Sequence, residues 1–510
     1  MLAIVHSIAL IGLEGYVLRV EVDVAGGLPA WEIVGLPDTA VREAKDRVKA
    51  AIRNAGFDFP SRKITVNLAP ADIKKEGSAY DLPIALGILA ATQQLSAERL
   101  SEFVFLGELS LDGSVRPVSG VLPAIAAVSG DGFRKAVVPL ENAGEAALVP
   151  DMEIYGAENL SQLTRFLSGE EELVPFAVDP AALLRDDAGD ELDMADVKGH
   201  PAAKRALEVA AAGGHNVLML GPPGSGKTML ARRVPGILPS LTLEEAIECT
   251  KLFSLCGLLA PGQHLVTRRP FRAPHHTCSS VALAGGGKVP RPGEISLANK
   301  GVLFLDELPE FPRDALEALR QPLEDGTISI SRVSAAVTYP AEIMLVASMN
   351  PCPCGYYGDP QKECRCSPLQ IQRYVRRVSG PLLDRIDIQI EVGRLNYSEL
   401  TGPTPGERSS VIRARVEAAR AKQRERLAGT GADCNARMTV RQIRQFCRLT
   451  PDAAGILKAA FDQLDLSARA HDRILKVART IADLEGCELI EAGHIAEAVQ
   501  YRTLDRKYWA

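Results

Sequence analysis

The sequence has no long apolar run and no basic leader. Across its 510 residues, no stretch approaches the ~20 consecutive apolar residues of a membrane-spanning helix, which argues against a membrane protein. The first 22 residues, MLAIVHSIALIGLEGYVLRVEV, lack the basic leader and small-residue cleavage site of a signal peptide, and they alternate like a strand. We therefore expect a cytoplasmic protein.

The sequence also lacks a strong net charge and an internal repeat. A formal net charge of −6 gives no global signal for nucleic-acid binding, although a mild average can hide a local basic patch. No repeat of solenoid period is present. Because cytoplasmic thiols are kept reduced, we do not expect the ten cysteines to form a disulfide framework. The length predicts about three globular domains.

The charge distribution divides the chain. Residues 170–196 hold ten acidic residues and one basic residue, which favours a solvated linker, and we assign an acidic linker to 169–196. Residues 408–448 reverse the balance, with eleven Lys or Arg against three acidic residues. This basic stretch fits a solvated helical face and a polyanion-binding surface equally well.

The two ends of the chain differ in pattern. The first segment, 1–168, alternates strand-like runs with helical ones. Within it, DTAVREAKDRVKAAIRNAG predicts a helix with Asp38 as its N-cap and Gly56 beyond its end. The last segment, 397–510, is mostly helical in pattern.

The middle of the chain carries a phosphate-binding motif. NVLMLGPPGSGKTML reads as a buried strand, a glycine-rich loop and the start of a helix, the context that the motif requires. Backbone N–H groups of such a loop surround phosphate oxygens. Lys227 would reach the β- and γ-phosphates of ATP, and the Thr228 hydroxyl would ligate Mg²⁺. The ATP-binding residues are Gly221, Pro222, Pro223, Gly224, Ser225, Gly226, Lys227 and Thr228.

The second half of this site is GVLFLDELPEF, a buried strand ending at two acids. Asp306 would hold Mg²⁺ through water, and Glu307 would polarise the attacking water. A surface acidic pair is the alternative, but the two half-sites require each other and both are present. A third strand, EIMLVASMN, ends at Asn350, which could orient that water. The sequence therefore predicts ATP hydrolysis.

Extra structure separates these motifs. Lys227 and Asp306 lie 79 residues apart, and the interval contains the adjacent His275 and His276. Neighbouring histidines point in different directions, so we favour a loop role over a metal site. After Asp306, GTISISRVSAAVTYPAEI predicts two strands joined by a turn with Arg332 near its tip.

Four cysteines gather in the polar loop 350–368. Their pattern is Cys-x-Cys, nine residues, Cys-x-Cys, which predicts a structural Zn²⁺ held by four thiolates. The spacing is narrower than the usual Cys-x-x-Cys, so a metal-free loop is the alternative. The loop joins Asn350 to a segment rich in arginine, and a metal would fix one relative to the other. The cysteines are Cys352, Cys354, Cys364 and Cys366, and the arginines are Arg373, Arg376, Arg377 and Arg385.

Four motifs together carry a family resemblance: GPPGSGKT, GEISLANKGVLFLDELPEF, SMNPCPCGYYGD and SGPLLDRIDI. The chain resembles the AAA+ ATPases of the magnesium-chelatase-like group, specifically the YifB/ComM family, over nearly its whole length. The resemblance implies a ring, expected to be a hexamer, with ATP at subunit interfaces. It implies that Arg385 acts as an arginine finger on a neighbour's ATP and that Asn350 is sensor 1. It also implies that Arg469 is sensor 2, with Arg473 as the alternative.

The resemblance implies an α/β fold in three parts. Residues 1–168 resemble a Lon-protease α+β domain, 197–396 an AAA+ P-loop α/β domain with a parallel sheet, and 397–510 a helical lid. Ala79 stands at the position of the protease nucleophile, beside Ser78, and Leu122 stands where the activating Lys belongs. Without that amine a serine would have no base, so we expect a non-proteolytic module.

The resemblance also implies a substrate. ComM-like proteins are associated with branch migration of DNA during natural transformation and recombination, so we expect a helicase or translocase acting on branched or single-stranded DNA. Arg332 and the basic stretch are the candidate phosphate contacts. One alternative is a magnesium-chelatase-type ATPase that remodels a protein or metal-insertion partner. An ATP-dependent protease is disfavoured by Ala79 and Leu122.

Overall fold

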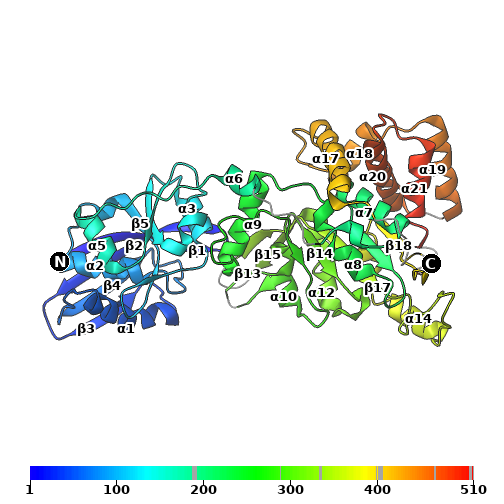
Figure 1. Ribbon diagram of the computed structural model, residues 1–510. Coiled ribbons are helices and arrows are strands. Elements are labelled where there is room, and N and C mark those ends of the chain that lie inside the picture. Colours follow the sequence, from blue (N-terminus) through cyan, green and yellow to red (C-terminus); the bar gives the residue numbers. More distant parts are fainter. Residues whose placement is uncertain are drawn as a thin grey trace. The chain divides into compact units, whose positions relative to one another are not determined.

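The computed structural model (Figure 1) forms two compact units. One consists of Met1–Asp186 with Leu243–Thr267, and the other of Asp187–Thr242 with Arg268–Ala510. The structure describes residues 1–185, 192–287, 289–331, 336–397, 399, 406–464, 467–504 and 508.

The first unit is built on a seven-stranded mixed sheet in the order β3-β4-β2-β1-β5-β8-β9. β1, β2 and β4 pair antiparallel, whereas β5, β8 and β9 continue parallel to β1. β6 and β7 form a separate small hairpin. The strands are β1 (Leu2–Ile11), β2 (Glu14–Ala25), β3 (Ala30–Val34), β4 (Lys63–Ala69), β5 (Phe103–Phe105), β6 (Glu108–Leu109), β7 (Val115–Arg116), β8 (Lys135–Pro139) and β9 (Glu153–Ala157).

Helices cover this sheet. The predicted helix at Asp38 is α1, because the Asp38 carboxylate accepts a 2.8 Å hydrogen bond from the Val41 N–H and Gly56 follows the helix with φ 91°. α2 is buried along its whole length. The helices of this unit are α1 (Thr39–Asn54), α2 (Asp81–Ala91), α3 (Val121–Val128), α4 (Ala143–Ala146), α5 (Leu160–Ser168), α6 (Pro180–Arg185) and α9 (Leu243–Cys256).

α9 reaches the first unit from a distant part of the sequence. The Gly120 N–H donates a 2.9 Å hydrogen bond to the Ser254 carbonyl, and α9 packs on α3. The His264 ring fills the space beside Gly144, where an added Cβ would lie 2.0 Å from its Nδ1. The segment Leu243–Thr267, which the sequence boundaries assign to 197–396, therefore clusters with the first unit.

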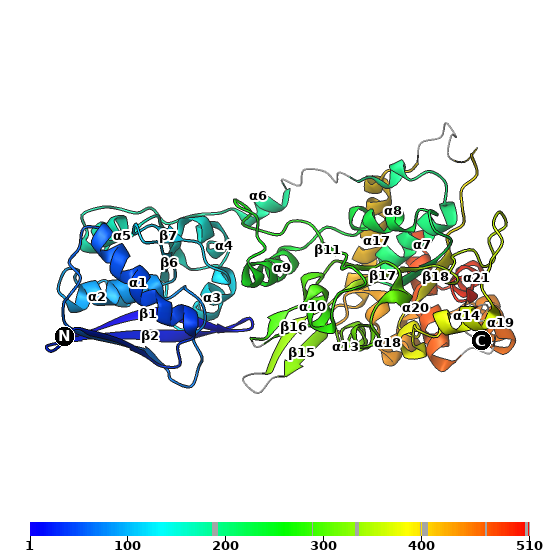
Figure 2. The same cartoon turned by 90° about the horizontal axis from the view of Figure 1, so that it is seen from below.

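The second unit contains a five-stranded parallel sheet in the order β11-β14-β17-β10-β18. β10, β14 and β17 are buried throughout, which explains their uninterrupted apolar sequences. Two hairpins are separate from this sheet. One pairs β12 with β13, and the other pairs β15 with β16 (Figure 2). The strands are β10 (Val217–Leu220), β11 (Phe271–Arg272), β12 (Gly285–Gly286), β13 (Arg291–Pro292), β14 (Val302–Leu305), β15 (Thr327–Ser331), β16 (Ala336–Pro340), β17 (Met344–Met349) and β18 (Ile388–Glu391).

Short helices accompany the strands of this sheet. α7 packs against β18 and α8 against β17, whereas α13 packs against β15 of the separate hairpin. The helices of this region are α7 (Pro201–Gly213), α8 (Lys227–Arg232), α10 (Ser280–Ala284), α11 (Glu294–Leu297), α12 (Arg313–Glu317), α13 (Arg320–Asp325), α14 (Pro368–Val375) and α15 (Gly380–Leu383).

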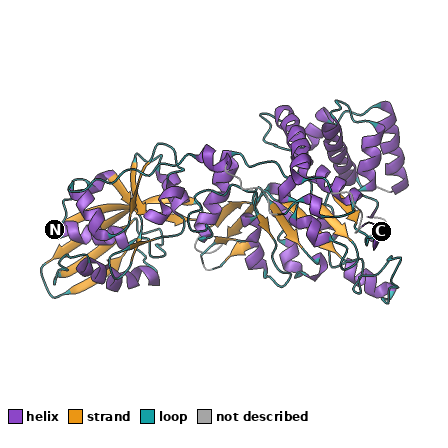
Figure 3. Ribbon diagram, viewed as in Figure 1, coloured by secondary structure: helices purple, strands orange, loops and turns teal. Residues whose placement is uncertain are grey.

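After residue 408 the described chain is drawn as helices and loops (Figure 3). One hydrophobic core contains Val217 of β10, Ala210 of α7, Val416 of α17 and Ile481 of α20, so these helices pack as one body with the sheet. No described helix is long and apolar enough to cross a bilayer. The helices are α17 (Ser409–Arg426), α18 (Val440–Phe446), α19 (Pro451–Leu464), α20 (Ala468–Glu485) and α21 (Ala492–Gln500).

Many arginines of the basic stretch 408–448 bond to other residues of the same unit. Arg415 pairs with Glu407 and Glu208, and Arg426 pairs with the buried Asp483. Three more of its arginines bond carbonyls or carboxylates of the same unit: Arg413, Arg420 and Arg437. These contacts favour the structural interpretation of the stretch over a polyanion-binding surface.

Candidate functional site

The predicted motifs meet at one edge of the parallel sheet. β17 lies between β10 and β14, with Leu220 opposite Met349 and Leu305 opposite Ala347. Because these strands are parallel, the segments that follow them emerge at the same edge, where ligands of open α/β sheets bind. The glycine loop, Asn350 and the pair Asp306–Glu307 all begin there.

The glycine loop requires its glycines. Gly224 and Gly226 have φ of 77° and 88°, which other residues rarely adopt. A Cβ on Gly221 would lie 2.1 Å from the Val392 carbonyl oxygen. The hydroxyl of Ser225 is buried and has no hydrogen-bond partner among the described residues. A buried, unpaired hydroxyl in a loop of this shape suits a phosphate oxygen as its acceptor.

Lys227 lies in a cage of oxygens. Its Nζ donates to the carbonyls of Gly221 (2.7 Å) and Pro222 (3.0 Å) and lies 3.4 Å from Asn350 Oδ1. Burial lowers the pKa of Lys227 to about 8, partly opposed by nearby Asp306 and Glu307. A phosphate in the loop would supply the negative charge that this desolvated ammonium lacks.

Thr228 and Asp306 are brought together as the sequence predicts. The Thr228 Oγ1 donates a 2.8 Å hydrogen bond to Asp306 Oδ2, and Ser348 donates to Asp306 Oδ1. A hydroxyl beside a carboxylate is the oxygen pair that holds Mg²⁺ in P-loop enzymes. Together with the unpaired Ser225 hydroxyl, this arrangement fits a bound Mg²⁺–nucleotide.

Glu307 has a partner that the sequence pattern did not reveal. Its Oε2 lies 3.2 Å from His276 Nδ1, and its backbone is left-handed with φ 55°. The His276 ring packs on that of His275, with 4.2 Å between centroids. The adjacent histidines do belong to a loop, and this loop reaches the acid expected to activate water.

Replacing His276 with Ala should raise basal ATP turnover without changing the KM for ATP. Once released from the imidazole, the Glu307 carboxylate is free to accept a proton from water. An exposed pair of this kind is worth up to about 1 kcal/mol, which corresponds to about a fivefold rise in kcat. Steady-state ATPase assays measure this, with His275→Ala as the control because His275 bonds Thr277 instead. Unchanged turnover, or an equal rise in the control, would contradict this role.

Arg385 lies at the opposite edge of the sheet. It precedes β18, and its carbonyl accepts a 2.9 Å hydrogen bond from Asn216, which precedes β10. The four residues of β10 alone span about 13 Å between this edge and the glycine loop. The Arg385 guanidinium donates to the Pro381 carbonyl (2.8 Å) and pairs with Glu324.

Arg469 and Arg473 line the same cavity as Arg385. The cavity has a volume of about 560 Å³, and no residue of the glycine loop is among its described lining residues. Arg469 approaches Asp384 at 3.6 Å, and Arg473 pairs with Asp387 at 3.1 Å. Burial opposes ionisation of Asp387, but its bond with His215 and the charge of Arg473 hold its pKa well below the usual range.

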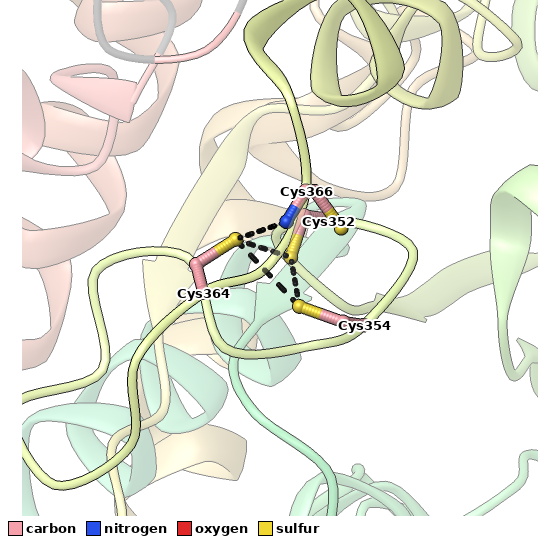
Figure 4. Close-up of side chains that lie close together, drawn as sticks. All are labelled: Cys352, Cys354, Cys364 and Cys366. Carbon is pink, nitrogen blue, oxygen red and sulfur yellow. Dashed lines mark hydrogen bonds between the residues drawn. The ribbon is translucent and has the colours of Figure 1, made fainter.

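The four cysteines of the loop after β17 converge (Figure 4). The sulfur of Cys352 lies 3.4 Å from that of Cys354 and 3.6 Å from that of Cys364, and the last two are 3.6 Å apart. Cys366 completes a group whose sulfurs all lie within 4.8 Å of one another. All four are free thiols.

Comparison with known proteins identifies families and individual proteins that this chain resembles. Residues 193–400 match the family described as magnesium chelatase, subunit ChlI, and 20–142 and 406–502 match two further ChlI families. The competence protein ComM of Haemophilus influenzae is 48% identical over 99% of this chain and 98% of the relative. The chain belongs to the ComM/YifB family. The YifB protein of Escherichia coli is 45% identical, with the same coverage of both chains.

Membership confirms the family predicted from the motifs and supports an AAA+ ATPase that uses ATP and Mg²⁺. The predicted α/β class agrees with the mixed and parallel sheets. The boundaries 1–168, 169–196, 197–396 and 397–510 stay predictions.

The chain also has a partial likeness to a protease. The archaeal Lon protease of Thermococcus kodakarensis is 28% identical over 169 residues, 31% of this chain and 26% of the relative. Leu122 is fully buried in α3, and the Ser78 hydroxyl donates to Glu108 rather than to an amine. The buried Lys75 donates to the Pro70 carbonyl. The described residues thus give Ser78 no activating Lys among its hydrogen-bond partners.

The β15–β16 hairpin confirms the predicted pair of strands, with Ser331 opposite Ala336. Arg332, the residue predicted near its tip, lies outside the described residues.

Proposed function

We propose that this protein is a ring-forming motor that hydrolyses ATP at subunit interfaces to act on DNA. The observation that carries the proposal is the separation of its catalytic groups. Lys227 and Glu307 lie at the carboxyl edge of the sheet, whereas Arg385 lies at the amino edge. A subunit cannot bring its own Arg385 to its own phosphates, so a neighbouring copy must supply it.

Arg469 extends the same argument. It shares a cavity with Arg385, so sensor 2 would also serve the neighbour's nucleotide. Closed rings are the usual solution for a head-to-tail interface of this kind, and we propose a hexamer. We place the ring in the cytoplasm.

The residues of one chain then divide the work. Lys227 exchanges its carbonyl partners for the β- and γ-phosphates, and the Ser225 hydroxyl gains an acceptor. Thr228 and Asp306 would hold Mg²⁺, which neutralises charge on the transferred phosphoryl group when bound. Glu307 accepts a proton from the attacking water, and Asn350, already beside Lys227 Nζ, orients that water.

The arriving arginine must change partners. In the single chain Arg385 is paired with Glu324, so it has to leave that carboxylate to reach a neighbour's γ-phosphate. Hydrolysis in one subunit is thereby linked to an ion pair in the next. Such coupling allows the subunits of a ring to hydrolyse ATP in sequence rather than independently.

DNA is the substrate we favour. The Haemophilus influenzae relative is named a competence protein. In this chain the β15–β16 hairpin is inserted between β14, which Asp306 follows, and β17, which Asn350 follows. A force on the hairpin would therefore act on both catalytic segments. The basic stretch contributes less to this proposal, because many of its arginines pair internally.

Forked DNA should stimulate ATP turnover, and binding should weaken steeply as salt is raised, because arginine–phosphate contacts release counterions. Arg332→Ala should lose most of the stimulation while keeping its basal rate. Arg444→Ala, an exposed arginine of the basic stretch, is the matched control and should keep it. Fork binding at low salt and ATPase rates with and without the fork measure both effects. A DNA-independent ATPase with no fork affinity would contradict the proposal.

A second candidate is a chelatase-type ATPase that remodels a protein or metal-insertion partner, because the three matching families carry the name of a magnesium-chelatase subunit. Partner-dependent insertion of Mg²⁺ into a porphyrin, without DNA stimulation, would favour it. A protease is the weakest candidate, given Ala79 and Leu122. We propose that the first unit is a non-proteolytic module for assembly or for guiding a substrate.

A further inference from the structure

We propose that Cys352, Cys354, Cys364 and Cys366 bind one structural Zn²⁺ and that this metal site braces the phosphate-binding loop. Four thiolates at 2.3 Å from a tetrahedral zinc lie about 3.8 Å from one another. The observed separations among the first three sulfurs are 3.4–3.6 Å, and the fourth lies within 4.8 Å of the others. The cluster has the size of the proposed cage.

Other roles for the cysteines explain less. A disulfide needs sulfurs about 2.05 Å apart, and no such bond is formed by any of the four. Hydrophobic filling would account for Cys352, which is fully buried, but the other three are partly exposed in a polar, turn-rich loop. The Cys366 N–H points at the Cys364 sulfur at 3.4 Å, a contact typical of backbone amides around metal-bound thiolates.

The cysteine-containing loop, residues 350–368, contacts the glycine loop directly. Gly355, next to Cys354, has φ 85°, and a Cβ added there would lie 2.5 Å from Pro223 of the glycine loop. On the other side, Cys352 follows Asn350 by two residues. The loop therefore touches the glycine loop and is continuous with the residue proposed to orient water.

A second anchor ties the loop to β18. The Tyr356 ring stacks under the Arg394 guanidinium at 5.4 Å, and Arg394 pairs with Asp359 at 3.2 Å. Arg394 follows the carboxyl end of β18, so the loop spans the sheet edge from β17 to β18. Without the metal, only these contacts would hold the loop in place, so its position beside the glycine loop would be less fixed.

Metal content tests the site independently of any ATPase activity. Full-length protein purified without chelator should contain about one Zn²⁺ per chain by elemental analysis. Cys366→Ser should lose most of this zinc, whereas Cys278→Ser, a cysteine outside the cluster, should retain it. Growth in cobalt should yield protein with the absorption bands of tetrahedral Co²⁺–thiolate. Folded wild-type protein without zinc, or cobalt-loaded protein without those bands, would overturn the metal site.

The brace rests on the proposed ATPase and needs a separate variant. Gly355→Ala should keep its zinc but raise the KM for ATP several-fold, since the added methyl group alone would lie 2.5 Å from Pro223 and push it away. Circular dichroism establishes that the variant is folded. A zinc-loaded Gly355→Ala protein with wild-type KM would overturn the brace and leave the metal site standing. If zinc-loaded wild-type protein and its variants all lack ATPase activity, that result would count against the ATPase proposal instead.

Discussion

Replacing Glu307 with Gln should leave ATP binding intact and slow hydrolysis by at least about 100-fold, the usual contribution of a general base. The amide keeps the size of the carboxylate but cannot take a proton from water. Glu307 makes no hydrogen bond or ion pair with Lys227 or Thr228 among the described residues, so the phosphate site should keep its shape. Nucleotide affinity by fluorescence and turnover by phosphate release measure the two effects separately.

Lys227→Ala is the matched control for this experiment. It removes the ammonium that three oxygens surround, so it should abolish binding as well as turnover. If Glu307→Gln hydrolyses ATP at more than about a tenth of the wild-type rate, Glu307 is not the base, because general bases contribute more than that.

Arg385→Ala should reduce turnover about 1,000-fold or more, as loss of an arginine finger does in other P-loop enzymes. The reason is geometric: Arg385 lies at the amino edge of the sheet, and no described residue of the glycine loop lines its cavity. ATP binding to the glycine loop of the same chain should survive. Phosphate release and nucleotide affinity are again the measurements.

Mixing distinguishes a finger from a structural arginine. Arg385→Ala keeps a complete glycine loop, and Lys227→Ala keeps a complete Arg385. When the two inactive proteins are mixed, some interfaces pair an intact glycine loop of one subunit with an intact Arg385 of the next. Part of the activity should therefore return. Glu324→Gln controls for loss of the intramolecular ion pair. No recovery in mixtures proven to co-assemble would contradict catalysis across the interface.

The geometry of the proposed phosphate site could be predicted from the sequence because its residues lie close together in the chain. Gly224, Gly226 and Lys227 act within one short loop, and their spacing fixes their geometry. Asp306 and Asn350 each follow a buried apolar strand, and the carboxyl ends of parallel strands lie at one edge of the sheet. Local pattern and topology thus give the same answer.

The rest depended on contacts between distant segments. The residues next to His276 do not indicate that it contacts Glu307. The one signal in the sequence was its position between the two halves of the site. The basic stretch was ambiguous because the carboxylates that pair with it, such as Glu208 and Asp483, lie elsewhere in the chain. The docking of Leu243–Thr267 on the first unit depends on the shape of Gly144 and Gly120, which no periodicity reveals.

The position of Arg469 shows the same limit. Its family position identified it as a candidate, but only the fold puts it beside Asp384 in the cavity of Arg385. Arg473, the alternative, forms an ion pair with Asp387, and His215 bonds the same carboxylate. Arg469 is therefore the better placed of the two to meet a neighbour.

The most direct test is ATP turnover per subunit as a function of protein concentration, with the assembly state followed in parallel by light scattering. A site shared between copies predicts turnover that is near zero for monomers and rises steeply as rings form. Constant turnover per subunit down to concentrations at which the protein is strictly monomeric would contradict a nucleotide site completed by Arg385 of a neighbouring copy.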